Sequence, residues 1–184
     1  MGKVVLGMTM PLDGFINNRN GSVERLYPDL VELGRTEMLQ ESIRTTGAVV
    51  MGRHAFAMGD PDSYARNYEY QVPIFVLCEM APYKLPKQDR SLTFTFVTDG
   101  IVSALEKARK AAGDRNVQVI GGANVAQQCI RAGLMDEIQS GIMSVLLCGG
   151  LRLFEHLGTA QIQLERIRVI DSPPRTDLRF RVRK

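Results

Sequence analysis

Residues 117–120 constrain the fold of this chain more than any other stretch. Their sequence, Val-Gln-Val-Ile, is short, mostly apolar and β-branched, as expected of a central strand covered on both faces of a sheet. Gly121 and Gly122 end the run, and apolar residues then recur at helical spacing until Gly133. A buried strand that leads through glycines into a helix is typical of an α/β protein.

The Gly121-Gly122 step is a candidate phosphate-binding turn. Glycines at the end of a strand let a phosphate approach the backbone, and the following helix offers free N–H groups and a partial positive charge. Asn124 and Ala126 stand where a Rossmann Gly-x-Gly-x-x-Gly motif would need glycine, so a Rossmann domain is disfavoured. From the residues alone, a tight turn that serves only packing remains an equal alternative.

Strand and helix patterns alternate along the rest of the chain. Apolar runs predict strands at residues 4–10, 48–51 and 73–77, and period-2 alternation predicts another at 92–97. Helices are expected from Asp29 to Thr46, ended by Gly47, and from an Asp99 N-cap to Gly113. A strand is expected from residue 136 through Leu147, and alternating strands flank a Ser-Pro-Pro turn at residues 172–174. We therefore predict one α/β domain over residues 1–184, with a mixed, mostly parallel sheet, helices on both faces and a C-terminal antiparallel hairpin.

Two more predicted strands end in residues suited to a ligand. Residues 48–51 run into Gly52-Arg53-His54, where a planar guanidinium and an imidazole can both meet phosphate oxygens. The strand at 73–77 ends at Leu77, Cys78 and Glu79. A solvated Arg-His pair is the alternative for the first of these. Because ligands of such sheets bind at the carboxyl ends of strands, two Gly-to-helix turns together favour a dinucleotide.

The loop at residues 11–21 carries large apolar side chains, Leu12, Phe15 and Ile16, between turn-forming residues. Such a loop beside a central strand is a candidate lid over a site. A loop that tucks these side chains beneath itself is an equal alternative.

Composition excludes several classes of protein. The 184 residues are 45% hydrophobic and 23% charged, values of an ordinary globular protein. The net charge is only +3, Trp is absent and no basic block occurs, so nucleic acid is not an expected partner. The three cysteines lack metal-ligand spacing and lie in apolar runs, as buried thiols of a reducing compartment do. With neither a signal-peptide core nor an apolar run long enough to span a bilayer, we expect a cytoplasmic protein without metal or membrane.

The last predicted strand places Arg179, Arg181 and Arg183 on one face. A basic face on a terminal hairpin is most often a solvated edge that discourages aggregation. Binding of a phosphorylated ligand or of a second subunit is the minor alternative. Because the hairpin offers an edge, we expect a homodimer.

Four motifs follow one another here as they do in the dihydrofolate reductase superfold. They are Met10-Pro11-Leu12-Asp13-Gly14-Phe15-Ile16, Val50-Met51-Gly52-Arg53-His54, Val119-Ile120-Gly121-Gly122-Ala123 and Gly133-Leu134-Met135-Asp136-Glu137-Ile138. Residues 146–154 also resemble the Leu-Gly-x-Gly-x-x-Leu-Phe segment of one branch, the carboxyl-terminal reductase domain of bacterial riboflavin biosynthesis deaminase-reductases. The resemblance covers nearly the whole chain and implies a dihydrofolate reductase-like three-layer α/β/α fold.

The resemblance implies NADPH as cofactor. In that family the Gly-Arg turn holds the pyrophosphate and the 2′-phosphate, and the Gly-Gly turn covers the pyrophosphate from the other side. The third strand end runs along the adenosine, and the loop after the first strand closes over the nicotinamide. The residues implied to bind the cofactor are Met8, Gly14, Ile16, Gly52, Arg53, His54, Leu77, Cys78, Gly121, Gly122, Ala123, Asn124 and Val125.

Two carboxylates are the catalytic candidates. Asp13 lies in the loop implied to close over the nicotinamide and is a candidate proton source. Dihydrofolate reductases carry a pterin-binding carboxylate at the place that Thr36 occupies here, and Glu37 follows one position later, rotated by about 100° on a helix. The Trp that usually neighbours the pterin is also missing, so folate reduction is not expected.

The implied activity is transfer of hydride from NADPH to a C=N or C=O bond of a small pyrimidine- or pterin-like heterocycle. The best-defined reaction of the family reduces the ribosyl group of 5-amino-6-(5-phosphoribosylamino)uracil. No deaminase zinc signature is present, which fits a stand-alone reductase domain. The alternative is a non-catalytic NADP(H)-binding or interaction protein, suggested by the missing carboxylate and Trp.

Overall fold

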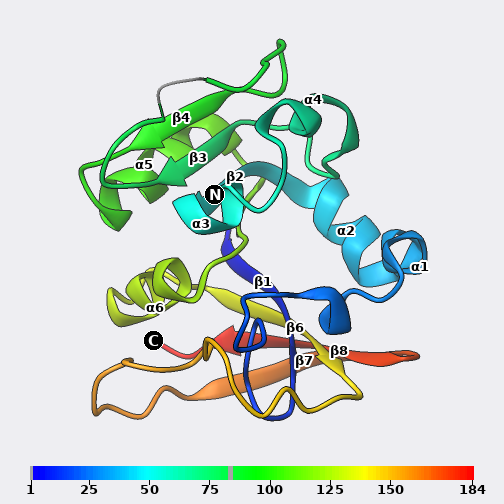
Figure 1. The fold of residues 1–184 in the computed structure, drawn as a ribbon. Coiled ribbons are helices and arrows are strands. Elements are labelled where there is room, and N and C mark those ends of the chain that lie inside the picture. Colours follow the sequence, from blue (N-terminus) through cyan, green and yellow to red (C-terminus); the bar gives the residue numbers. More distant parts are fainter. Residues whose placement is uncertain (1, 83–84) are drawn as a thin grey trace.

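A computed structural model describes residues 2–82 and 85–184 of the chain (Figure 1). Their strands form a single sheet. The strands are β1 (Val4–Pro11), β2 (Thr46–Gly52), β3 (Ile74–Leu77), β4 (Phe94–Val97), β5 (Asn116–Val119), β6 (Glu137–Met143), β7 (Leu164–Ser172) and β8 (Arg175–Val182). Their order across the sheet is β4-β3-β2-β5-β1-β6-β8-β7. Pairing is parallel from β4 to β6, and β8 pairs antiparallel with both β6 and β7. The predicted mixed sheet with a C-terminal hairpin is confirmed.

Helices cover both faces of the sheet (Figure 1). They are α1 (Leu30–Arg35), α2 (Glu37–Thr45), α3 (Arg53–Phe56), α4 (Tyr64–Asn67), α5 (Ile101–Ala112) and α6 (Ala123–Arg131), with 3-10 turns η1 (Glu24–Leu26) and η2 (Pro61–Ser63). Side chains of α5 and α6 pack with Leu6, Val50 and Val119 in one core cluster. On the opposite face, Val49 and Met51 pack with aromatic side chains from α3, α4 and β4. This is the expected three-layer α/β/α architecture.

The strand order brings the predicted ligand-binding ends together. From β2 the chain adds β3 and β4 toward one edge of the sheet. It then returns to place β5 between β2 and β1, and β6 lies on the other side of β1. The carboxyl ends of β3, β2 and β5 are therefore neighbours. In open α/β sheets this reversal of strand order is where ligands bind.

The structure corrects three predicted boundaries. The helix expected from Asp29 to Thr46 is broken at Thr36, which is extended and whose hydroxyl accepts a hydrogen bond from the Leu39 amide to begin α2. Gly47 lies inside β2, where a Cβ would come within 2.7 Å of the Ala112 carbonyl oxygen, so this glycine serves close packing and does not end the helix. The strand expected to reach Leu147 stops at Met143.

Two side-chain expectations also change. Gly100 is the N-cap of α5, and the Asp99 carboxylate instead accepts hydrogen bonds from Ser103 and Lys107. Among the cysteines, Cys129 is buried and Cys78 is half-buried, but Cys148 is exposed. Apolar neighbours in sequence did not bury Cys148 because it lies in the loop that follows β6.

Charged side chains hold the hairpin to α2 and β6. Glu41 of α2 accepts from Arg179 of β8 at 2.7 Å, and it also pairs with Arg168 of β7. Arg179 reaches the buried Glu137 of β6 as well, at 2.7 Å, and Lys3 pairs with the same carboxylate. The structure thus contradicts the solvated-edge interpretation for Arg179, whose side chain is only 14% exposed.

Within residues 2–82 and 85–184, no helix is long and apolar enough to cross a membrane. The His, Cys, Asp and Glu side chains of the same ranges form no group that could hold a metal ion.

Candidate active site

The glycine turns after β2 and β5 are in direct contact. The Gly52 amide donates a 3.0 Å hydrogen bond to the Gly121 carbonyl oxygen, and the Ile120 amide donates to Val50. Sheet pairing therefore continues beyond the strands into the turns. As a result, the N-termini of α3 and α6 open side by side at the carboxyl edge of the sheet.

This contact requires glycine at position 121 and favours it at position 52. Gly121 has φ +58°, and a Cβ there would lie 2.7 Å from the Cβ of Ala55. A Cβ on Gly52 would lie 3.1 Å from the side chain of Val125. Gly122 differs, because a Cβ there would meet nothing within 4 Å. Packing thus explains two of the glycines, whereas Gly122 faces open space.

The start of α6 offers backbone and not side chains. Gly122 is its N-cap and makes no side-chain hydrogen bond to the first turn. Ala123 and Val125 are buried in the core, while exposed Asn124 accepts a hydrogen bond from Gln128 one turn later. A helix N-terminus of this kind can receive an anion through its N–H groups.

A cavity of about 390 Å³ adjoins the α3 turn. Arg53 and Cys78 line it, together with the aromatic rings of Phe56 and Phe96. Its volume falls in the roughly 300–1,000 Å³ range of ligand pockets, and its walls can hold a planar ring beside a phosphate-binding guanidinium. His54 is exposed on α3, next to Arg53, and Leu77 packs against the core at the end of β3.

Met8 connects the glycine turns to the centre of the sheet. Its Sδ accepts a hydrogen bond from the Gly121 amide at 3.2 Å. Met8 also lines a second cavity, of about 100 Å³, together with Ile120. A ligand that runs along the strand ends could therefore reach this second cavity at Met8.

The loop after β1 is fastened to the segment at residues 148–153. The Ile16 amide donates to Leu151, and the Leu153 amide donates to Gly14. Ile16 is 7% exposed and belongs to the core. The apolar side chains of the loop thus divide, because Ile16 tucks inward and Phe15 is half-buried, whereas Leu12 is exposed. The role of the loop as a lid stays a prediction.

Asp13 lies in the same loop. One carboxylate oxygen, Oδ2, accepts from the Cys148 amide at 2.8 Å. The other, Oδ1, is buried and has no hydrogen-bond partner among the described residues. An unpartnered buried carboxylate oxygen is costly unless a ligand or water meets it, so Asp13 has capacity to bind one more donor.

Polar side chains cross the second cavity in a row. Thr9 of β1 lies opposite Gly141 of β6, which in turn lies opposite Asp177 of β8. Arg175, two positions before Asp177, shares its face and pairs with it at 2.9 Å. Arg175 also approaches the Thr9 hydroxyl at 3.5 Å, so the row joins three strands.

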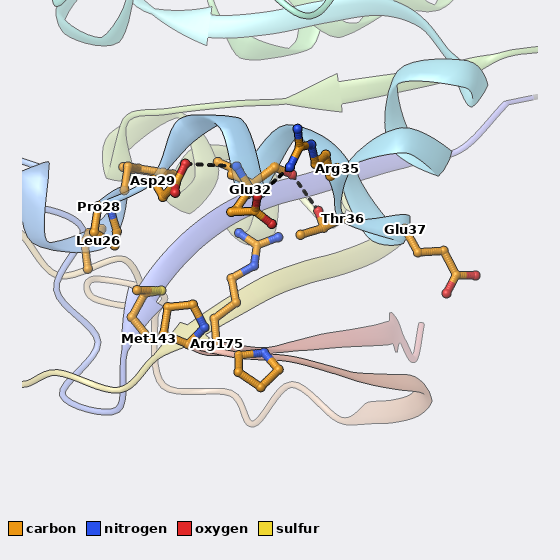
Figure 2. A pocket seen from close by; sticks show the side chains of 13 residues that line it. Leu26, Pro28, Asp29, Glu32, Arg35, Thr36, Glu37, Met143 and Arg175 are labelled. Carbon is orange, nitrogen blue, oxygen red and sulfur yellow. Dashed lines mark hydrogen bonds and ion pairs between the residues drawn. The ribbon is translucent and has the colours of Figure 1, made fainter.

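A third cavity, of about 350 Å³, continues from the second beneath α1 and α2. The two share Tyr27, Leu33 and Arg175 in their walls. Figure 2 shows the Arg175 guanidinium pointing into this cavity toward Glu32 and Thr36.

Glu37 stands at the edge of the same cavity. Its side chain points away from Arg175 in Figure 2, is 65% exposed and pairs with Arg168. Asp13 lines none of the three cavities described here. The structure therefore does not bring the two catalytic candidates together, and their catalytic roles stay predictions.

Burial perturbs the titration of three groups around the second cavity. It raises the pKa of the Asp177 carboxyl, although the Arg175 charge opposes the shift. It likewise raises the pKa of Tyr27, where Thr9 opposes the shift. Glu69 remains open to solvent, yet the cavity walls crowd its carboxyl, disfavour its charged form and raise its pKa. Carboxyls whose pKa is shifted within a cleft are candidates for functional groups.

Comparison of the sequence with known families decides which family the chain belongs to. The sequence model of the RibD C-terminal domain matches residues 2–174. The chain belongs to the RibD C-terminal domain family.

Among curated proteins, the chain is 25% identical to the uncharacterized protein YyaP of Bacillus subtilis (strain 168). The alignment covers 83% of this chain and 80% of YyaP. Among solved structures, a putative riboflavin biosynthesis protein from Shewanella sp. PV-4 superposes with a TM-score of 0.79 at 19% identity, covering 99% of both chains. Dihydrofolate reductase from Enterococcus faecalis superposes with a TM-score of 0.61 at 16% identity, covering 100% of this chain and 98% of that one. The predicted family and fold are thus confirmed.

Sequence reasoning missed the polar row of this RibD C-terminal domain. Thr9, Arg175 and Asp177 come together only through the pairing of β1, β6 and β8. The one available signal was the period-2 spacing of Arg175 and Asp177 beside the turn, which places both on one face of a strand. Gly141, the residue that leaves room for them, carries no signal in an isolated sequence.

Proposed function

We propose that this chain is an NADPH-dependent reductase that transfers hydride to a C=N or C=O bond of a small heterocycle. The observation that carries the proposal is the contact of Gly52 with Gly121, linked through Met8 to a cavity lined by polar side chains. This arrangement supplies two helix N-termini for a pyrophosphate and, beyond them, a place for a substrate.

The residues present fit the cofactor. Gly121, the unobstructed Gly122 and the first turn of α6 (Ala123, Asn124 and Val125) would meet the pyrophosphate on one side, through backbone N–H groups, and Gly52 would meet it on the other. Arg53 and His54 would bind phosphate, and Leu77 and Cys78 would lie along the adenosine at the 390 Å³ cavity. Met8, Gly14 and Ile16 would border the nicotinamide. When bound, the cofactor supplies the hydride.

Asp13 is proposed to orient or hold a proton at the end of β1. Its Oδ1 has no hydrogen-bond partner within residues 2–82 and 85–184 and is screened from water, which suits a group that exchanges one hydrogen bond with a ligand. Glu37 is proposed as a substrate-binding carboxylate only if it leaves Arg168 and turns inward. The other duties of the protein are to orient the reactants and to exclude water.

The reaction type follows that of a similar protein. The Thermotoga maritima diaminohydroxyphosphoribosylaminopyrimidine deaminase/5-amino-6-(5-phosphoribosylamino)uracil reductase superposes with a TM-score of 0.73 at 16% identity, with 98% of this chain covering 56% of that one. We propose a reduction of that type, on a pyrimidine- or pterin-like ring, in a cytoplasmic enzyme.

A homodimer is proposed from the exposed edge of the sheet. The apolar side chains of Leu164 and Val169 on β7 are 44% and 48% exposed, and their pairing with β8 places them on the face of the half-buried Leu178. An uncovered apolar strip on an edge strand is suited to pairing with a second copy.

The test is whether the protein oxidises NADPH when pyrimidine, pterin or quinone acceptors are added. Oxidation is monitored as the loss of NADPH absorbance. Turnover with any acceptor supports the reductase. Tight binding of NADPH without turnover would favour the alternative, a non-catalytic NADP(H)-binding protein, which the outward position of Glu37 suggests. Absence of NADPH binding would contradict both.

A further inference from the structure

We propose that the substrate is an uncharged or cationic heterocycle without a phosphate group, held by Arg175 and Asp177 in the joined cavities beside Gly141. This inference rests on the proposed function, because it assigns these cavities to the substrate of the reductase. It departs from the phosphoribosyl compound named for the Thermotoga protein.

Gly141 is what allows Arg175 and Asp177 to reach the cavity. A Cβ at Gly141 would lie 3.1 Å from the Arg175 Nη1 and 3.2 Å from the Asp177 Oδ1. The two side chains therefore lie across β6, where a Cβ at position 141 would press against both of them. From there they extend from the hairpin as far as Thr9 of β1.

Both side chains are buried, and Arg175 has an unsatisfied donor. The side chain of Arg175 is 10% exposed and that of Asp177 only 2%. The Arg175 Nε is buried without a hydrogen-bond partner among the described residues. A guanidinium that is buried, points into a cavity and keeps a donor unpaired is unfavourable unless a further polar group completes its surroundings.

The pair presents donors and an acceptor side by side. The guanidinium can only donate, and the carboxylate can only accept while it is ionised. Leu33 and Leu39 form apolar walls beside the pair. A planar ring with a carbonyl or ring nitrogen next to an N–H or amino group matches this set, with its faces on the apolar walls and its polar edge on the pair.

The charge around the cavities disfavours phosphate. Among the described residues, the acidic side chains that line the two cavities outnumber the basic ones. The acidic residues are Asp29, Glu32, Glu37, Glu69 and Asp177, and the basic residues are Arg35 and Arg175.

Both cations are already neutralised. Arg35 pairs with Glu32 at 2.7 Å, and Arg175 pairs with Asp177 at 2.9 Å. Glu37 pairs in turn with Arg168, so the cavity carboxylates without a cation partner among the described residues are Asp29 and Glu69. A phosphate dianion would thus meet these two carboxylates, and neither Arg35 nor Arg175 would be free to pair with it. Like charges arranged against a ligand exclude it, whereas a neutral ring pays no such penalty and a cationic ring is attracted.

The test uses the full chain saturated with NADP⁺ and three probes at low salt: uridine, uridine 5′-monophosphate and 2,4-diaminopyrimidine. Binding is measured by calorimetry. We expect 2,4-diaminopyrimidine to bind at least as tightly as uridine, and uridine 5′-monophosphate to bind about tenfold more weakly, with the difference shrinking as salt screens the carboxylates. Phosphate that strengthens binding, or no binding of any probe to NADP⁺-loaded protein, would overturn the inference.

Variants separate charge from recognition. Glu32→Gln combined with Asp29→Asn removes two exposed carboxylates, and asparagine still caps α1. Uridine 5′-monophosphate should then bind about threefold to tenfold more tightly, since loss of the Asp29 charge lowers the repulsion and loss of the Glu32 charge frees the Arg35 guanidinium. The matched control, Glu106→Gln on exposed α5 surface, should change nothing. Equal behaviour of the double variant and the control would count against the proposal.

Asp177→Asn tests the pair itself. We expect 2,4-diaminopyrimidine to bind at least about tenfold more weakly, because a charged hydrogen bond is lost, while NADP⁺ affinity stays unchanged. If this variant does not fold, the Glu32→Gln/Asp29→Asn variant still decides the question. Loss of NADP⁺ binding by the unmodified chain would instead contradict the proposed function.

Discussion

The Gly52 amide and the Gly121 carbonyl oxygen lie 3.0 Å apart, in a hydrogen bond that joins two strand-to-helix turns distant in sequence. Each turn alone is a weak indication of a phosphate site. Joined, they place two helix N-termini at the reversal point of the sheet, where ligands of α/β proteins bind. The proposed cofactor site depends on this contact.

Replacement of Gly121 by alanine should damage both fold and binding. The residue has φ +58°, and the new Cβ would lie 2.7 Å from Ala55. We expect a loss of about 1–3 kcal/mol in the free energy of unfolding, measured with urea. The contrasting variant is Gly122→Ala, whose Cβ meets nothing within 4 Å and whose φ is −73°.

Gly122→Ala should leave the free energy of unfolding nearly unchanged but weaken NADPH binding, because the methyl group would occupy the approach to the first turn of α6. Unchanged NADPH affinity in this variant would show that the cofactor does not sit on that turn.

Arg53→Gln should weaken NADPH binding about tenfold to a hundredfold, as loss of a charged hydrogen-bond partner worth about 1.5–3 kcal/mol predicts. Binding of NADH should fall less, because NADH lacks the 2′-phosphate. Arg53 is exposed, so the variant should remain folded. Titration by nucleotide fluorescence measures both affinities, and an equal loss for the two cofactors would mean that Arg53 does not contact the 2′-phosphate.

Stability should fall in acid partly through Glu41. Burial by itself would raise the pKa of this carboxyl, but the hydrogen bond and charge of Arg179, and then those of Arg168, outweigh it and lower the pKa below the usual 4.5. Because the folded-state pKa lies below the unfolded one, the stabilisation is present above about pH 4.5 and is lost as the pH falls through the folded-state pKa.

Urea unfolding across this pH range provides the measurement for Glu41. Glu41→Gln should lose about 1–3 kcal/mol at neutral pH and decline less steeply in acid than the unmodified chain. Glu106→Gln, on the exposed surface of α5, is the control. Identical pH profiles for Glu41→Gln and the unmodified chain would mean that the ion pairs of Glu41 contribute nothing to stability.

Val169→Asp tests the proposed homodimer. Val169 is 48% exposed on the edge strand β7, so a charge there should leave the fold intact but disrupt an apolar interface. Light scattering coupled to gel filtration should report a dimer for the unmodified chain and a monomer for the variant. A monomeric unmodified chain would refute the dimer.

Much of the fold could be predicted because local patterns and the sheet agree. Apolar runs identified β1, β2, β3 and β5, period-2 alternation identified β4, and the glycines at 121, 122 and 133 marked the limits of α6. The break at Thr36 could not be predicted, since the apolar stripe continues on both sides of it. The break depends on the Thr36 hydroxyl, which makes two hydrogen bonds. It accepts from the Leu39 amide at the start of α2 and donates to the Leu33 carbonyl oxygen at the end of α1.

The candidate site divides in the same way. Residues in a local motif, such as Gly52-Arg53 and Gly121-Gly122, could be predicted as candidate site residues. Their suitability for phosphate follows from the glycine backbone and the arginine charge, and does not depend on residues distant in sequence. The roles of Arg175 and Asp177 could not be predicted from the sequence. Their positions depend on the antiparallel register of β6 and β8, and on Gly141 of β6, which no local motif distinguishes.

The most direct test of the account is thermal unfolding with NADPH, with NADH and ATP as controls. At about 100 times its dissociation constant, NADPH should add roughly 2.7 kcal/mol of stability. For a chain of this length, that corresponds to a rise of roughly 5–10 °C in the melting temperature. We expect a larger rise with NADPH than with NADH, and the smallest with ATP. No rise with either nicotinamide nucleotide would contradict the proposal that the joined Gly52 and Gly121 turns bind a reductase cofactor.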